Sequence, residues 1–222
     1  MTSSASSAAR AFLRENGAYV SAHKAAQVIA ASLRSHFVQR RLHTTGLRLG
    51  PGHKLVGLAH THIGRNLRTG SGFWLEAITC NAGETYSPHL SIGDNCNLSN
   101  NVHIGCTHRV TIGSNLLCGS NVLITDHGHG IYRGPAQTAP GISPKHRPLN
   151  RDGVILIGSN VWLGDGVLIF AGANIGDGCV VGANSLVRHT LPPRTLCVGS
   201  PAKPIRQWSD SAQSWQPYDG QN

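Results

Sequence analysis

The side chains best suited to chemistry stand in one short stretch, where Asp126, His127 and His129 occupy three of four consecutive positions. An imidazole titrates near neutral pH and can take a proton from a weak nucleophile such as a hydroxyl group, a contribution of about 10²–10⁴-fold to the rate. Sequence spacing leaves both histidines open as that general base. Asp126 has two interpretations, a turn-forming residue and a carboxylate that orients an imidazole.

The same histidines could ligate zinc together with His103 or His108, since imidazole is a common zinc ligand. An H-x-H pair in a loop is a weak indication of a metal, so a site without metal is favoured. The six cysteines of the chain contain no C-x-x-C pair, which argues against a zinc knuckle and against a disulfide framework. We expect them to be buried free thiols in a reducing cytoplasm.

A six-residue repeat surrounds this cluster and must position it. In the C-terminal half, an aliphatic residue stands at every sixth position: Ile157, Leu163, Ile169, Ile175, Val181 and Val187. This period does not match the 3.6-residue turn of an α-helix, but it suits short strands that meet at tight corners. Gly, Asn or Asp between the aliphatic positions supply the backbone conformations that corners require. Three hexads complete one triangular coil, so the repeat predicts an all-β fold, a parallel β-helix.

The repeat also occurs upstream, and one long loop interrupts it. It runs from Ile92 to Ile104, slips by two residues and resumes from Ile112 to Ile124, with weaker traces back to Leu49. Residues 125–152 then form a proline-containing loop. A loop of this length in a solenoid is usually functional, and this one begins with the histidine cluster. We therefore expect the site at this interruption.

Helices are expected on both sides of the solenoid. Residues 21–42 predict an amphipathic helix whose apolar stripe contains four residues: Ala25, Ile29, Leu33 and Phe37. We expect this helix to cap the first coil, and a membrane-surface or partner-binding helix is the alternative. A short helix around residues 205–208 and a flexible tail are expected at the end. The predicted organisation is a helical extension (1–45), the β-helix domain (46–200) and a C-terminal helix and tail (201–222).

Charge and hydropathy restrict the partners. The formal net charge of +9 implies an anionic partner, but the basic residues are scattered and aromatic residues make up only 5% of the chain. Few base-stacking platforms are therefore available, and nucleic acid is not expected as a partner. No segment approaches the roughly 18 apolar residues of a membrane span, and residues 1–7 lack the apolar core of a signal peptide. We expect a cytoplasmic protein, with peripheral association at the inner membrane face as a further option.

Three stretches resemble the hexapeptide-repeat, or left-handed β-helix, acetyltransferases, and in particular the O-acetyltransferases of bacterial O-antigen and capsule polysaccharides. They are ITDHGHGIYRG (124–134), IGSNVWLGDGVLIFAGANIGDGCVVGANSLV (157–187) and VGSPAKPIR (198–206), within a resemblance that covers about residues 49–206. The resemblance implies left-handed coiling, assembly as a homotrimer, acetyl-CoA as co-substrate and no metal. It implies acetyl transfer to a sugar hydroxyl, in a surface polysaccharide or its lipid-linked precursor.

The resemblance also assigns roles to residues. His127 occupies the position of the family's catalytic base, His129 competes for it, and Asn101 falls near an asparagine that assists catalysis. The residues implied for coenzyme A are Trp162, Gly164, Asp165, Ala183, Asn184, Lys203 and Arg206. Core filling is the alternative for Trp162, and ordinary solvation is the alternative for Lys203 and Arg206. Arg188 and His189 depart from the Thr-Lys of many relatives, so contacts to the coenzyme are expected to differ in detail.

Acceptor recognition is expected in the interrupting loop, at Tyr132, Arg133, Lys145 and Arg147, whose positive charge suits an anionic glycan or a lipid-linked sugar. The same fold accepts small sugars and amines, so O- and N-acetylation both remain open. Two other functions are alternatives. One is a non-catalytic β-helix that acts as a scaffold or binds polyanions. The other is a zinc enzyme similar to the γ-class carbonic anhydrases, which share the fold and use three histidines.

Overall fold

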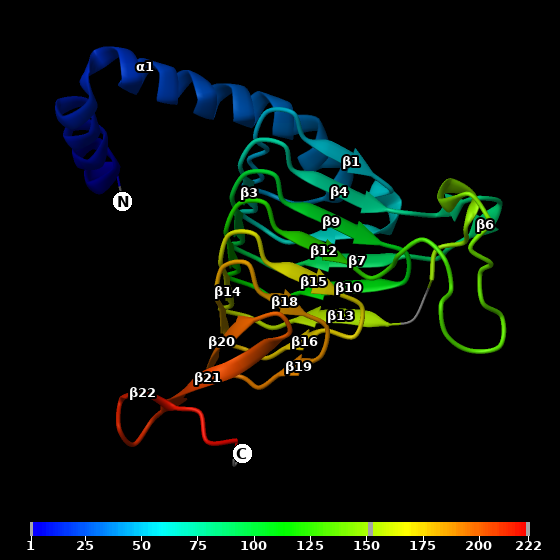
Figure 1. The fold of residues 1–222 in the computed structure, drawn as a ribbon. Helices are drawn as coiled ribbons and strands as arrows, with labels where there is room; N and C mark the ends of the chain where they lie inside the picture. Colours follow the sequence, from blue (N-terminus) through cyan, green and yellow to red (C-terminus); the bar gives the residue numbers. More distant parts are fainter. Residues whose placement is uncertain (1, 151–152, 221–222) are drawn as a thin grey trace.

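A three-faced solenoid forms the body of the protein (Figure 1). The computed structural model describes residues 2–150 and 153–220. Each coil contributes one short strand to each of three sheets, and strands of successive coils pair in parallel. The fold is the parallel β-helix that the hexad pattern predicted, with the left-handed coiling that the resemblance implied.

The three sheets are named here after their central strands. The β12 sheet contains β1 (Lys54–Val56), β4 (Trp74–Ala77), β9 (His103–Cys106), β12 (Leu123–Thr125), β15 (Leu168–Phe170) and β18 (Leu186–Val187). The β10 sheet contains β2 (Thr61–Ile63), β7 (His89–Ile92), β10 (Arg109–Ile112), β13 (Val154–Ile157), β16 (Asn174–Ile175) and β19 (Thr190–Leu191). The β11 sheet contains β3 (Arg68–Thr69), β8 (Asn97–Leu98), β11 (Leu117–Cys118), β14 (Trp162–Leu163), β17 (Val180–Val181) and β20 (Thr195–Gly199).

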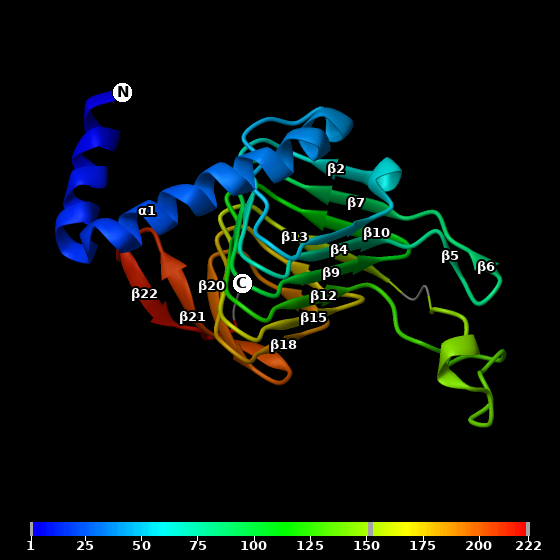
Figure 2. The same cartoon turned by 90° about the horizontal axis from the view of Figure 1, so that it is seen from above.

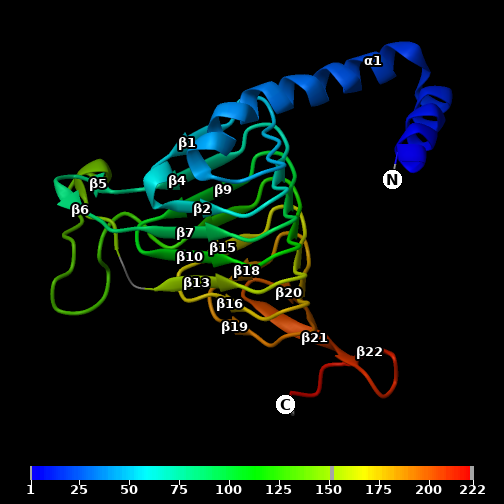
Figure 3. The ribbon, with the colours of Figure 1, turned by 180° about the vertical axis from the view of Figure 1, so that it is seen from behind.

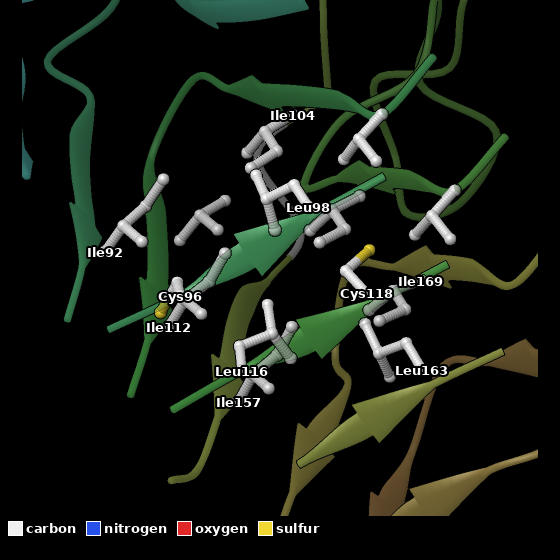
Figure 4. Packing of buried hydrophobic residues seen from close by; sticks show 14 of the residues in the cluster. Ile92, Cys96, Leu98, Ile104, Ile112, Leu116, Cys118, Ile157, Leu163 and Ile169 are labelled. Atoms are coloured by element: carbon white, nitrogen blue, oxygen red, sulfur yellow. The ribbon is translucent and has the colours of Figure 1, made fainter. Parts of the chain in front are cut away.

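The aliphatic positions of the hexads stack into ladders inside the coil. Ile92 pairs with Ile112, Ile112 with Ile157 and Ile157 with Ile175, so that one inward position repeats from coil to coil. Figure 4 shows these side chains turned toward the interior, where Ile92, Ile112 and Ile157 are at most 3% exposed. Full burial of such a side chain stabilises a fold by about 1.5–3 kcal/mol. The repeated ladder is therefore the core.

Asparagines form one set of corners. Asn95, Asn115 and Asn160 have φ values of 59°, 60° and 58°, in the left-handed region that asparagine tolerates better than most residues. Their side-chain amides donate to one another along the stack, Asn95 to Asn115 at 3.3 Å and Asn115 to Asn160 at 3.0 Å. These side-chain bonds connect successive coils at the corner between two strands.

The N-terminal helix differs from the prediction in length and in the side that it buries. Helix α1 spans Thr2–Leu42 with a kink at Gly17, and the predicted apolar stripe is exposed, Ile29 by 61%, Leu33 by 69% and Phe37 by 79%. This stripe therefore does not cover the first coil.

The reason is the open edge of the first coil, whose backbone groups require hydrogen-bond partners. The hydroxyl oxygen of Ser35 accepts from the N–H of Leu49 at 2.8 Å, and the Arg34 guanidinium donates to the carbonyl oxygen of Leu49 at 3.3 Å. Gln39 accepts from the N–H of Leu47 at 3.0 Å. The side of α1 that faces the coil therefore carries these polar groups together with Val38 and Leu42, and the predicted stripe faces away.

The C-terminal prediction is also corrected. Residues 205–208 belong to the long strand β21 (Ala202–Ser209), not to a helix, and β22 (Ser214–Pro217) lies within the expected flexible tail. β21 pairs antiparallel with β20 and β22 with β21, which Figure 3 shows as an arm that leaves the solenoid. The free edge of β20 offers a full set of backbone partners, which outweighs a weak local helical tendency. Residues 221–222 lie outside the described residues.

Two projections lie side by side on one flank of the solenoid (Figure 2). One is the hairpin of β5 (Cys80–Asn81) and β6 (Glu84–Thr85), and the other is the interrupting loop, of which residues 151–152 are outside the described part. The N–H of Leu149 donates to the hydroxyl of Tyr86 at 2.9 Å, which joins loop to hairpin. Short 3-10 turns occur at Leu58–His60 and Pro144–His146. The histidine cluster begins where the loop leaves β12.

Candidate active site

Asp126 closes the corner at which the hexad repeat slips. Its carboxylate is fully buried and accepts hydrogen bonds from Thr107 through the backbone N–H at 2.8 Å and the hydroxyl at 3.1 Å. It also accepts from the backbone N–H groups of His108 at 2.8 Å and Arg109 at 2.9 Å. The backbone N–H groups of the turn between β9 and β10, and of the first residue of β10, thus point at a single carboxylate. Burial raises the pKa of Asp126, but hydrogen bonds from His127, Thr107 and His108 outweigh it, and the net pKa is lowered.

The imidazole of His127 lies against this carboxylate. Its Nδ1 atom is 3.1 Å from Oδ1 of Asp126 and 3.2 Å from the hydroxyl of Thr125, and its side chain is 11% exposed. Because an ionised carboxylate only accepts hydrogen bonds, Nδ1 carries the hydrogen in this contact. The other nitrogen, Nε2, then keeps its lone pair and has no hydrogen-bond partner among the described residues. Both interpretations of Asp126 fit this geometry, the turn former and the orienting carboxylate.

His127 stands between two cavities. One, of about 470 Å³, is lined among others by Trp74, Glu76, Asn81 and His129. The other, of about 500 Å³, is lined among others by Arg133 and Arg188. Both cavities include His127 in their lining, so reactants bound in the two cavities would meet at this imidazole.

His129 has a different environment. It is exposed, forms an isolated backbone bridge with Leu149, and its carbonyl oxygen accepts from the hydroxyl of Tyr132 at 2.5 Å. No carboxylate of the described residues is placed to orient its ring. It lines the smaller cavity together with His127. The geometry therefore favours His127 over His129 as the oriented base.

The predicted acceptor residues divide into two groups. Tyr132 and Arg133 line the larger cavity beside His127. Arg147 is engaged within the loop, because its guanidinium donates to the Tyr132 hydroxyl at 2.9 Å and to the carbonyl oxygens of Pro140 and Ile142 at 3.0 and 2.8 Å. Lys145 lies in the exposed turn Pro144–His146, and neither cavity beside His127 includes it.

The residues implied for coenzyme A lie at another corner. Trp162 is 52% exposed on the outside of the β11 sheet, as its hexad position predicted. Gly164 and Asp165 follow β14 and Ala183 and Asn184 follow β17, and the two segments stack, since a methyl group on Gly164 would lie 2.6 Å from the N–H nitrogen of Ala183. This corner starts the β12 sheet, whereas His127 follows its far end. At about 3.3 Å per residue, the distance across that face is on the order of 15–20 Å.

Three further candidates also lie away from His127 within one protomer. Lys203 and Arg206 are exposed on β21, where Arg206 donates to the carbonyl oxygen of Trp215 at 3.3 Å. Asn101 has a φ of 55° at a corner before β9 and donates to Asn121 at 3.1 Å. The register places it at the opposite end of β9 from His127. One protomer therefore does not bring these residues to the imidazole.

Sequence reasoning missed Glu76 and Trp74, which line a cavity together with His127, and it considered His103 only as a zinc ligand. Nε2 of His103 lies 3.0 Å from Oε1 of Glu76, so this imidazole is engaged with a carboxylate. In residues 2–150 and 153–220, His, Cys, Asp and Glu side chains form no cluster of three or more that could hold a metal ion. Five cysteines are buried free thiols, whereas Cys80 is exposed on β5, which corrects the expectation for that residue.

The fold defines the class of the protein, a left-handed β-helix of hexapeptide repeats, and sequence comparisons add the family. No family model matches the chain. It is 36% identical over 156 residues to WbbJ of Escherichia coli (strain K12), a protein named as a lipopolysaccharide biosynthesis O-acetyltransferase; the match covers 70% of this chain and 76% of that protein. It is 34% identical over 131 residues to the galactoside O-acetyltransferase of the same strain, with 57% and 58% covered.

Solved structures agree on the fold. AntD, an N-acyltransferase from Bacillus cereus, superposes with a TM-score of 0.60 at 16% identity, over 81% of this chain and 90% of that chain. The hexapeptide-repeat acetyltransferase VCA0836 of Vibrio cholerae gives 0.50 at 24% identity, over 81% and 79%. The chain belongs to the hexapeptide-repeat acetyltransferase family and is an acyltransferase. No described helix has the length and apolar character needed to cross a membrane.

Proposed function

We propose that this protein is an O-acetyltransferase that moves the acetyl group of acetyl-CoA to a sugar hydroxyl, in a bacterial surface polysaccharide or its lipid-linked precursor. The observation that carries the proposal is the buried carboxylate of Asp126, which holds Nδ1 of His127 and leaves Nε2 free beside two cavities. The names of the two E. coli relatives, one for lipopolysaccharide biosynthesis and one for galactoside O-acetylation, support the reaction and the acceptor class.

In this proposal, Nε2 of His127 takes the proton of the acceptor hydroxyl while its oxygen attacks the thioester carbonyl carbon. The tetrahedral intermediate collapses with cleavage of the carbon–sulfur bond, and the imidazolium returns its proton to the departing thiolate of coenzyme A. Asp126 stabilises the imidazolium that forms in between, since its carboxylate is ionised. Direct transfer in a ternary complex needs no covalent acyl-enzyme, and proximity of both substrates supplies much of the rate.

The separation of the two corners supports assembly as a homotrimer. The segments implied for coenzyme A stand at one end of the β12 sheet and His127 at the other. A coenzyme that lies along the first corner of one protomer reaches the imidazole of a neighbour when the protomers pack side by side. Trp162, Gly164, Asp165, Ala183, Asn184, Lys203 and Arg206 are the contacts proposed on the coenzyme side.

Peripheral contact with the inner membrane face is also part of the proposal. The exposed stripe of α1 contains Ile29, Leu33 and Phe37, and Arg40 and Arg41 stand at the end of the helix. A helix with an apolar stripe and basic residues binds at the surface of anionic membranes. Such a location in the cytoplasm would bring the enzyme to a lipid-linked sugar.

The test is acetyl-CoA-dependent thiol release with a panel of sugar and amine acceptors. His127→Ala is expected to lose about 10²–10⁴-fold in kcat, the usual contribution of a general base, and to keep its circular dichroism and its mass by light scattering. His129→Ala, the matched control from the same loop, is expected to keep most of its activity. The opposite pattern would transfer the role of base to His129. Absence of acetyl-CoA binding by calorimetry would favour the non-catalytic scaffold.

A further inference from the structure

Lys54, Trp74 and His103 stack on one another on the outside of the β12 sheet, and Glu76 contacts the last of them. The ammonium nitrogen of Lys54 lies 4.0 Å from the centroid of the Trp74 indole, and the other face of that indole stacks on His103 with centroids 4.1 Å apart and planes 7° from parallel. Nε2 of His103 lies 3.0 Å from Oε1 of Glu76, whose side chain is 19% exposed. The carboxylate of Glu76 is therefore held in place on a rigid sheet.

Strand register places this carboxylate next to His127. Glu76 of β4 pairs with Gly105 of β9, and Gly105 pairs with Thr125 of β12, the strand that ends at the catalytic segment. A methyl group on Gly105 would lie 3.0 Å from Cε1 of His127 and 3.7 Å from Oε1 of Glu76. The two side chains are thus at most about 7 Å apart across the space that the glycine leaves open.

The cavity beside them has the polar groups that a polyhydroxy compound requires. Its lining includes Glu76, Asn81 and the two loop histidines, together with Trp74. Oε2 of Glu76 has no partner among the described residues, so it can accept a hydrogen bond from a hydroxyl. The indole N–H of Trp74 is buried and lacks an acceptor in the described part of the chain, an unusual cost for a residue without a function.

Charge distinguishes the two cavities beside His127. The cavity that contains Glu76 has a carboxylate in its wall, which can accept hydrogen bonds from the hydroxyl groups of a sugar. The cavity on the other side contains Arg133 and Arg188, whose guanidinium groups attract phosphates. A neutral polyhydroxy acceptor therefore fits the first cavity, away from Tyr132 and Arg133, the residues that the sequence predicted for it.

We infer that the cavity between β4, the β5–β6 hairpin and His127 is the acceptor subsite, and that Glu76 binds a hydroxyl of the sugar unit that is acetylated. This inference rests on the proposed function and extends it by assigning the acceptor a place and a recognition residue. In this arrangement, the β5–β6 hairpin forms a side wall of the acceptor subsite.

The test compares Glu76→Ala and Glu76→Gln with wild type, and Glu15→Ala on α1 is the control for loss of a glutamate far from the cavity. Methyl glucoside, galactoside and mannoside serve as acceptor probes. Loss of a hydrogen bond to a charged group weakens binding by about 10- to 100-fold, so the KM for the preferred glycoside should rise by that factor in Glu76→Ala. The rise should be smaller in Glu76→Gln, and the Kd for acetyl-CoA should stay within about 2-fold of wild type in both variants.

Ligand-observed NMR of glycoside binding separates the inference from the proposed function. If glycosides bind wild type but not Glu76→Ala, yet no variant releases thiol, the subsite stands and the proposed reaction fails. If wild type acetylates a glycoside and His127→Ala does not, while Glu76→Ala keeps the wild-type KM, the subsite is wrong and the reaction stands. Weaker acetyl-CoA binding in Glu76→Ala, or no glycoside binding to wild type, would also overturn the subsite.

Discussion

Replacement of Asp126 by asparagine perturbs the site most directly, because each oxygen of the carboxylate has its own hydrogen-bond partners. Oδ2 of Asp126 accepts from the N–H groups of His108 and Arg109, and Oδ1 accepts from Thr107 and faces Nδ1 of His127. The amide oxygen of asparagine is expected at the Oδ2 position, since the amide nitrogen there would oppose two backbone N–H groups. The amide nitrogen then stands at the Oδ1 position.

Two separate losses follow for Asp126→Asn. The N–H of Thr107 has no acceptor, and an unsatisfied buried donor costs about 1–3 kcal/mol, which for a chain of 222 residues lowers Tm by roughly 2–12 °C. Nδ1 of His127 must now accept a hydrogen bond from the amide nitrogen, so the ring hydrogen moves to Nε2. That atom can no longer take a proton, and kcat is expected to fall by about 10²–10⁴-fold.

The assay pairs thiol-release kinetics with thermal unfolding, and Asp94→Asn is the matched control. Asp94 accepts from the N–H of Arg65 at 2.7 Å at an exposed corner, so its replacement should leave kcat within about 2-fold of wild type. If Asp126→Asn keeps more than a tenth of the wild-type kcat while its fold is intact, Asp126 does not set the tautomer of His127.

Asp126 also predicts a dependence of stability on pH. The pKa of its carboxyl is lowered in the folded protein, so the unfolded chain binds that proton more tightly. This contribution to stability is present above the unfolded pKa of about 3.9 and is lost as pH falls through the lower folded value. Below about pH 4, the free energy of unfolding should therefore fall less steeply in Asp126→Asn than in wild type, and parallel slopes in acid titrations by circular dichroism would contradict the assignment.

Two further predictions concern a glycine and the N-terminal helix. Gly105→Ala would place a methyl group 3.0 Å from Cε1 of His127, so the imidazole must move by a fraction of an ångström. Since a displacement of about 1 Å can cost 10²-fold, kcat should fall by about 3- to 10-fold with little change in Tm. Gly141→Ala, where a methyl group meets no atom within 4 Å, should be neutral in the same assay, and equal activities of the two variants would refute the steric argument. Replacing Leu33 and Phe37 of α1 by serine should reduce co-sedimentation with anionic vesicles severalfold without lowering Tm, because both side chains are exposed; unchanged sedimentation would exclude the helix as a membrane contact.

Part of the site could be read from the sequence because its members are neighbours in the chain. Asp126 and His127 are adjacent, and they stand where the hexad period breaks, so residue type and position together indicated the candidate site. Glu76 gave no comparable signal. Its contact with His103 joins residues 27 positions apart, and that contact depends on the exact number of residues in the intervening coil.

The six-residue period by itself determined the architecture of this protein. It requires a corner after every short strand and a side chain that can be buried in every ladder position, and these are local demands that each hexad meets with its own residues. Only the tertiary structure decided which side of α1 is buried, whether the C-terminus forms a strand, and which residues stand beside His127. Those outcomes depend on backbone groups at open edges and on register between coils, which hydrophobic periodicity does not encode.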